Sequence, residues 1–149
     1  MDILVVDTNI FINAIFSDRF KNDERIMELE ENGFVRFAFS NQTKNELYRI
    51  VARKIEEYNT FDCAIFFENI TEIISRSKFI ANPKKLEKLS SDKGDQPFIE
   101  LAVDIGANYL ITNDFQNGLL ELDTYRNVKI STPKSYLKLY DKASRRKAT

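Results

Sequence analysis

The sequence contains no histidine and only one cysteine, Cys63, among its 149 residues. Without histidine, Ser-His-Asp and Cys-His nucleophile schemes, histidine acid–base catalysis and histidine-ligated zinc are all excluded. A single cysteine excludes an internal disulfide and any zinc site built from several cysteines, and its apolar neighbours Ala64 and Ile65 favour a core residue. Hydrolytic chemistry would therefore rely on carboxylates, which suit Mg²⁺ or Mn²⁺ better than zinc.

Long hydrophobic runs are missing as well. No apolar run approaches the ~20 residues that span a membrane, and Asp7 interrupts the first apolar run too early for a signal-peptide core. A content of 43% hydrophobic and 30% charged residues is typical of a globular protein, and 149 residues fit one domain. We therefore expect a cytoplasmic protein without a membrane partner.

The charge is unevenly distributed, although the formal net charge is only −1. Residues 1–125 hold 22 acidic and 14 basic side chains, a balance of −8, whereas residues 126–149 hold 8 basic and 1 acidic side chain, a balance of +7. Such an imbalance allows an electropositive end beside an acidic pocket. We expect one domain over residues 1–141 and a basic, mobile tail over residues 142–149.

Two short apolar runs each lead into an aspartate. Residues 3–6 precede Asp7, and residues 109–112 are followed closely by Asp114. Runs of Ile, Leu and Val between polar residues are typical of strands buried on both faces of a parallel sheet. Because such sheets bind ligands at the carboxyl ends of their strands, we expect both acids at the same edge.

Helical and extended patterns alternate along the chain. Apolar periodicity predicts helices at residues 10–16, 26–31, 43–58, 60–74, 97–105 and 134–140. Strands are predicted at residues 3–6, 34–39, 79–80, 109–112 and 128–130, with a loop at residues 17–23. Ser40 or Asn41 is expected to cap a helix, and Gly106 to end one. This alternation predicts an α/β fold, a three-layer α/β/α sandwich with a mostly parallel central sheet.

Two further acids can join the first pair. Asp95 starts the helix that leads into the Asp114 strand, and Glu46 borders the apolar stripe of the helix over residues 43–58. Four converging carboxylates repel one another unless a cation neutralises them. Each acid also has a simpler interpretation: Asp95 as a helix cap, Asp7 and Asp114 as turn residues, and Glu46 as an exposed helical acid.

The order and spacing of these motifs resemble a known family. The stretches VVDTNIFINAIF, DKGDQPFIELAVDIGANYLITND and KISTPKSYLKLY, with the Glu46 helix between the first two, are similar to PIN domains, in particular to the branch of toxin components of toxin–antitoxin pairs. The resemblance covers nearly the whole chain. It implies a Mg²⁺- or Mn²⁺-dependent endoribonuclease in which Asp7, Glu46, Asp95 and Asp114 are the catalytic and metal-binding acids.

The resemblance also implies supporting residues and partners. Asn9 matches the amide that steadies the first acid, Thr112 the hydroxyl that accompanies the last acid, and Asp92 an additional acid of this branch. The stretch FQNGLL after Asp114 departs from the family and contains no acid before Glu121. The resemblance therefore allows either one or two bound metal ions. The implied partners are RNA, an antitoxin protein and a second copy of the chain.

RNA would be held through its backbone charge while a metal-activated water attacks the phosphate in line. The candidate phosphate contacts are Lys84, Lys85, Lys88, Lys142, Arg145 and Arg146. Solvated surface charge is the simpler interpretation of these lysines and arginines.

Two other functions compete with a nuclease. One is a PIN-like scaffold that binds RNA or protein without cutting, although four retained acids argue against it. The other is a phosphoryl-transfer domain with Asp7 as nucleophile. A haloacid-dehalogenase-type phosphatase requires a second Asp where Asn9 stands, and a receiver domain requires paired acids near the first strand and a lysine after a later strand. Neither pattern is met.

Overall fold

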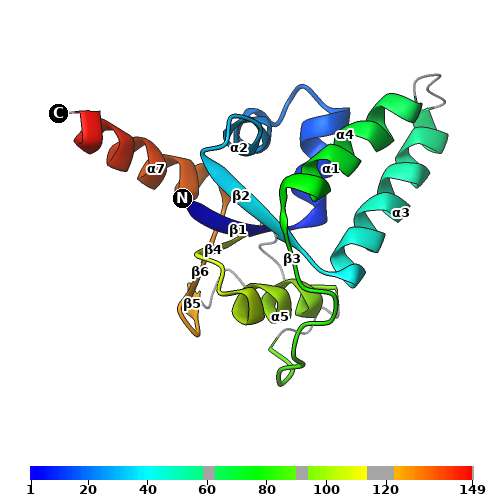
Figure 1. Ribbon diagram of the computed structural model, residues 1–149. Helices are drawn as coiled ribbons and strands as arrows, with labels where there is room; N and C mark the ends of the chain where they lie inside the picture. Colours follow the sequence, from blue (N-terminus) through cyan, green and yellow to red (C-terminus); the bar gives the residue numbers. More distant parts are fainter. Residues whose placement is uncertain (59–62, 90–93, 114–122, 149) are drawn as a thin grey trace.

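A mostly parallel sheet forms the centre of the computed structural model, which describes residues 1–58, 63–89, 94–113 and 123–148 (Figure 1). In this part of the chain the strands are β1 (Asp2–Val6), β2 (Val35–Phe39), β3 (Lys78–Phe79), β4 (Tyr109–Ile111), β5 (Thr124–Tyr125) and β6 (Val128–Ser131). Their order in the sheet is β3-β2-β1-β4-β6-β5, and every pairing is parallel except that of β5 with β6. The carboxyl ends of β1, β2, β4 and β6 therefore lie along one edge.

Helices cover both faces of the sheet. They are α1 (Thr8–Phe16), α2 (Lys21–Glu31), α3 (Asn41–Tyr58), α4 (Cys63–Arg76), α5 (Gln96–Ile105) and α7 (Pro133–Ala148). Helix α5 covers one face, and the other described helices cover the opposite face (Figure 1). Accordingly, Leu4 and Val6 of β1 belong to the larger core, while Val5 points into the core beneath α5. The predicted α/β/α sandwich is confirmed, and burial on both faces explains the continuous apolar strands.

Helix α3 begins as predicted. The backbone N–H of Thr43 donates to Ser40 Oγ at 3.1 Å, and the N–H of Ser40 donates back to Thr43 Oγ1 at 2.9 Å. These reciprocal bonds satisfy a free amide of the first turn, so Ser40 is the capping residue. The cap fixes the start of the helix that carries Glu46.

Helix α5 begins one residue before the predicted start, at Gln96, and ends at Ile105 as predicted. Pro97 lies in its first turn, and Gly106 ends it in the left-handed conformation, at φ 68°. Only glycine adopts that conformation without a steric penalty. Asp95 precedes the helix, but its side chain makes no capping hydrogen bond. Asp95 therefore occupies the N-cap position, as the helix-cap interpretation has it, without a capping bond from its side chain.

One predicted boundary and one connection differ from the structure. The predicted loop at residues 17–23 is shorter, because α2 already begins at Lys21 and buries Asp23 in its first turn. A hairpin of β5 and β6 was not predicted. Its turn residues Arg126 and Asn127 both have positive φ angles, 46° and 69°, a geometry that is usually signalled by glycine.

The last helix is longer than expected. It continues past residue 140 to Ala148, so most of the basic tail is the end of α7. Arg25 of α2 holds the extended part, since its Nη1 donates to Asp141 Oδ2 at 2.7 Å. Basic residues in the last turn are also favourable at the negative end of the helix dipole. The domain boundary at residue 141 and a mobile tail stay predictions.

No helix in the described part of the chain combines the length and the apolar character needed to cross a membrane.

Candidate active site

Asp7 is held at the carboxyl edge of the sheet, directly after β1. Its backbone N–H donates to the carbonyl of Ile111 at 2.9 Å, which continues the pairing of β1 with β4 by one residue. Thr112 follows β4, and its hydroxyl donates to Asp7 Oδ2 at 3.1 Å. The family resemblance associates this hydroxyl with the last acid, whereas the structure places it on the first. Thr112 thereby orients the Asp7 carboxylate.

Glu46 reaches the same edge from α3. Its Oε2 accepts a 2.6 Å hydrogen bond from the hydroxyl of Thr8, a buried residue that follows Asp7 in α1. This bond joins two segments that are 38 residues apart in the sequence. Glu46 is therefore an oriented acid, and not a freely solvated residue on the helix surface.

One pocket of about 530 Å³ brings three of the predicted acids together. Asp7, Glu46 and Asp95 line it, and Asn9 lines it from α1. The remaining lining residues are Thr8, Asn13, Ile50, Gly94, Phe98 and Asn113. None of these described lining residues is a lysine or arginine. Asp95 is only 8% exposed, so this carboxylate sits in the wall of the pocket.

The other two predicted acids, Asp92 and Asp114, lie outside the described residues. Asn113, the residue directly before Asp114 in the sequence, is part of the pocket wall. Among the residues that the structure describes, no three acidic, histidine or cysteine side chains come close enough together to hold one ion. Carboxylate, hydroxyl and amide oxygens are nevertheless the ligands that Mg²⁺ and Mn²⁺ prefer. The donor chemistry of the pocket therefore fits a hard divalent cation.

A buried acid behind the pocket was missed by the sequence analysis. Asp23 of α2 is 3% exposed and accepts hydrogen bonds from the side-chain amides of Asn13, at 2.9 Å, and Asn113, at 3.3 and 3.4 Å. Burial raises the pKa of Asp23, although both amides oppose the shift. Both asparagines line the pocket, so Asp23 supports its wall. The available signal was its position three residues before Ile26, on the buried stripe of α2.

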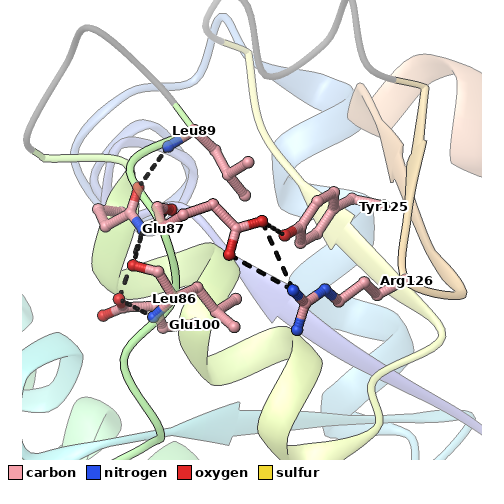
Figure 2. Close-up of polar contacts among 7 residues, drawn as sticks. Leu86, Glu87, Leu89, Glu100, Tyr125 and Arg126 are labelled. Carbon is pink, nitrogen blue, oxygen red and sulfur yellow. Dashed lines mark hydrogen bonds and ion pairs between the residues drawn. The ribbon is translucent and has the colours of Figure 1, made fainter.

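Helix α5, which starts beside Asp95, is tied to the preceding segment by its side chains. At intervals of four residues along α5, Gln96, Glu100 and Asp104 accept hydrogen bonds from backbone N–H groups of that segment. The bonds run from Leu89 to Gln96 Oε1 at 3.2 Å, from Leu86 to Glu100 Oε2 at 2.8 Å and from Lys84 to Asp104 Oδ2 at 3.1 Å. Figure 2 shows the first two of these bonds. Residues 84–89 are thereby held along α5.

The β5–β6 hairpin holds the same segment from its other side (Figure 2). The carboxylate of Glu87 accepts a 2.6 Å hydrogen bond from the hydroxyl of Tyr125 and pairs with Arg126 at 3.4 Å. The Tyr125 hydroxyl is the main cause that lowers the pKa of Glu87. These contacts hold residues 84–89 between α5 and the β5–β6 hairpin.

The predicted RNA-binding residues lie in two places. Lys84, Lys85 and Lys88 belong to the segment along α5, where Lys85 is 3.8 Å from Glu100. Lys142, Arg145 and Arg146 lie near the end of α7, which projects beyond the amino end of β1 (Figure 1). Their neighbours in α7 line a pocket together with Met1 and Asp2. This second group is therefore at the opposite edge of the sheet from Asp7.

The fold and the site together define an α/β/α domain with acids gathered at the carboxyl edge of a parallel sheet. The sequence matches the PIN domain family over residues 3–116, and the chain therefore belongs to that family. This membership confirms the resemblance drawn from the sequence motifs.

Among solved structures, the chain is similar to the crystal structure of VapBC2 from Rickettsia felis bound to a DNA fragment from their promoter. The TM-score is 0.57 at 19% sequence identity, and the match covers 87% of this chain and 98% of that chain. At this identity the likeness is one of fold. No curated protein sequence matches the chain.

Proposed function

We propose that the chain is a metal-dependent endoribonuclease. The observation that carries the proposal is the gathering of Asp7, Glu46 and Asp95 in one pocket whose described lining contains no basic side chain. Acids that line one pocket without a basic side chain among them favour a bound cation. Membership of the PIN domain family supports a nuclease over a phosphoryl-transfer domain.

The side chains would divide the work as follows. Asp7 and Asp95, together with Asp114, would hold Mg²⁺ or Mn²⁺. Bound there, such an ion supplies a water of lowered pKa and polarises the scissile phosphate. Glu46, held by the Thr8 hydroxyl, would ligate the ion or orient the attacking water. Thr112 would keep the Asp7 carboxylate in its binding orientation.

Cleavage of a labelled RNA tests this proposal. We expect activity with Mg²⁺ or Mn²⁺, loss of activity in EDTA, and a decrease of about 100-fold or more in Asp7→Asn, because several kcal/mol of transition-state stabilisation depend on the metal. Asp2→Asn is the matched control, since Asp2 stands at the other end of β1. Activity that survives both EDTA and Asp7→Asn would contradict the metal mechanism. RNA binding by the wild type without any cleavage would favour the scaffold.

We also propose that the chain is the toxin of a toxin–antitoxin pair. The fold similarity to a VapBC2 complex supports this role. Expression of the wild type should then arrest growth, and a small open reading frame next to the gene should relieve the arrest. Asp7→Asn should be harmless when expressed at the same level. Growth arrest by Asp7→Asn, or arrest that the neighbouring frame does not relieve, would contradict this role.

A further inference from the structure

A second pocket lies beside the acidic pocket and is lined by residues of α1 and α3. Both helices begin at the carboxyl edge of the sheet and contact each other. On α3, Glu46 and Ile50 line the acidic pocket, and at the same spacing of four residues Lys54 and Tyr58 line the second pocket, of about 820 Å³. Asn13 of α1 lines both pockets, so they adjoin. Along α3 the lining therefore changes from an acid, Glu46, in the first pocket to a cation and an aromatic ring, Lys54 and Tyr58, in the second.

The second pocket combines exposed aromatic rings with cations. Phe20 is 43% and Tyr58 is 58% exposed, and Arg19 and Lys54 lie beside them in the lining. The Tyr58 ring stacks on Phe16, with centroids 5.7 Å apart and an angle of 15° between the planes. Surfaces that bind single-stranded nucleic acid have this composition, because bases stack on aromatic rings and phosphates pair with cations.

The cations of the second pocket, Arg19 and Lys54, can bind an anion. Lys54 pairs with Glu57 at 3.3 Å, a partly exposed pair that contributes little and that a phosphate can replace. Asp18 also lines the pocket. Within the described residues, no carboxylate forms an ion pair with the Arg19 guanidinium. Basic side chains are thus present here but not among the described lining of the adjoining acidic pocket.

We propose that the pocket formed by Phe16, Arg19, Phe20, Lys54 and Tyr58 binds a nucleotide of single-stranded RNA that flanks the cleaved bond. A base stacks on Phe20 or Tyr58, and the backbone phosphate pairs with Arg19 or Lys54. This assignment rests on the proposed cleavage in the acidic pocket. Eight residues of α3 separate Glu46 from Lys54, which is about 12 Å along the helix axis. A strand that leaves the acidic pocket therefore reaches the second pocket after a short distance.

Fluorescence anisotropy of the full-length protein with a labelled RNA oligonucleotide in EDTA tests this pocket. We expect the single strand to bind more tightly than a duplex of the same sequence. At least one of Phe20→Ala and Tyr58→Ala should weaken binding about 5- to 100-fold, as loss of a stacked base does. Tyr58→Phe should retain affinity. At least one of Arg19→Ala and Lys54→Ala should reduce the salt dependence of binding by about 0.7 in the log–log slope, because one phosphate contact is lost.

Two substitutions at the other edge of the sheet serve as matched controls. Phe34→Ala removes an exposed aromatic ring near the start of β2, and Lys138→Ala removes an exposed cation from α7. Both should bind RNA like the wild type. The melting temperature of every variant should be measured, so that a loss of binding is not mistaken for unfolding.

The outcomes separate this inference from the proposed nuclease function. Cleavage by the wild type together with unchanged binding by all pocket variants would overturn the second pocket and leave the nuclease intact. Absence of cleavage together with weaker single-strand binding by the pocket variants would overturn the nuclease and leave the pocket. Equal affinity for single strand and duplex, or no RNA binding at all, would overturn the pocket.

Discussion

The two ends of β1 carry the same kind of contact in different surroundings. Asp2 at its start accepts a 2.8 Å hydrogen bond from the hydroxyl of Tyr136, and Asp7 after its end accepts a 3.1 Å bond from the hydroxyl of Thr112. At the amino end the partner is a buried tyrosine whose pKa is raised, mainly by burial. At the carboxyl end, Glu46 shares a pocket with the aspartate. The two aspartates therefore differ in their neighbours and not in the kind of hydrogen bond that they accept.

Loss of the hydroxyl at the carboxyl end should have the largest effect. Thr112→Val keeps the side-chain shape but removes the donor to Asp7. We expect RNA cleavage to fall about 10- to 100-fold, as is typical when a residue that orients a metal ligand is removed. The concentration of Mn²⁺ needed for half-maximal activity should rise as well. Unchanged kinetics would mean that the Thr112 hydrogen bond is not needed to orient the Asp7 carboxylate for cleavage.

Loss of the hydroxyl at the amino end should affect stability instead. Tyr136→Phe leaves Asp2 without its hydroxyl donor and should reduce the free energy of unfolding by about 1 kcal/mol, or the melting temperature by about 3 °C. Cleavage at a temperature well below the transition should match the wild type. A decrease in cleavage as large as that of Thr112→Val would contradict the expectation that the amino-edge bond affects stability and not activity.

The pH dependence of stability should reveal the raised pKa of Asp23, the buried acid behind the acidic pocket. Burial raises the pKa of Asp23 above the ordinary carboxyl value of 3.8. Its contribution to stability is therefore fully present below that value and is lost as the pH rises through the folded-state pKa. Asp23→Asn cannot titrate, so the melting temperature of the wild type relative to this variant should fall as the pH rises above about 4. A constant difference would contradict the raised pKa.

The smallest effect on RNA binding is expected at the end of α7. Reversing the charges of Lys142, Arg145 and Arg146 to glutamate should weaken binding and flatten its salt dependence, but by less than changes at Arg19 or Lys54. The reason is distance, because exposed charges beyond about 8 Å are largely screened at physiological salt. An effect larger than that of Arg19→Ala would place the RNA across the amino edge instead.

The acids of the site were predictable because topology alone brings them together. A strand that ends in an acid, followed by a helix, places Asp7 at the edge of a parallel sheet, and the same logic applies to Asp95 through the helix that precedes β4. The contacts that orient these acids were not predictable. Asp23 and Asn113 are 90 residues apart, and a hydrogen bond between distant side chains has no local sequence pattern.

The ends of elements were the least predictable part of the fold. Helix α7 continues to Ala148 without many apolar residues to announce it, and a contact with Arg25 of another helix holds Asp141. The β5–β6 turn uses Arg126 and Asn127 at positive φ, where a glycine would have signalled a hairpin. In both places tertiary contacts outweighed local preference.

The attachment of residues 84–89 to α5 has an evolutionary consequence. An edge strand bonds to backbone carbonyls, which are present whatever residue occupies a position. This segment bonds to the side chains of Gln96, Glu100 and Asp104, each of which a single nucleotide change can remove. Single substitutions at these three positions can therefore change how residues 84–89 are held, while the pairing of the sheet stays the same.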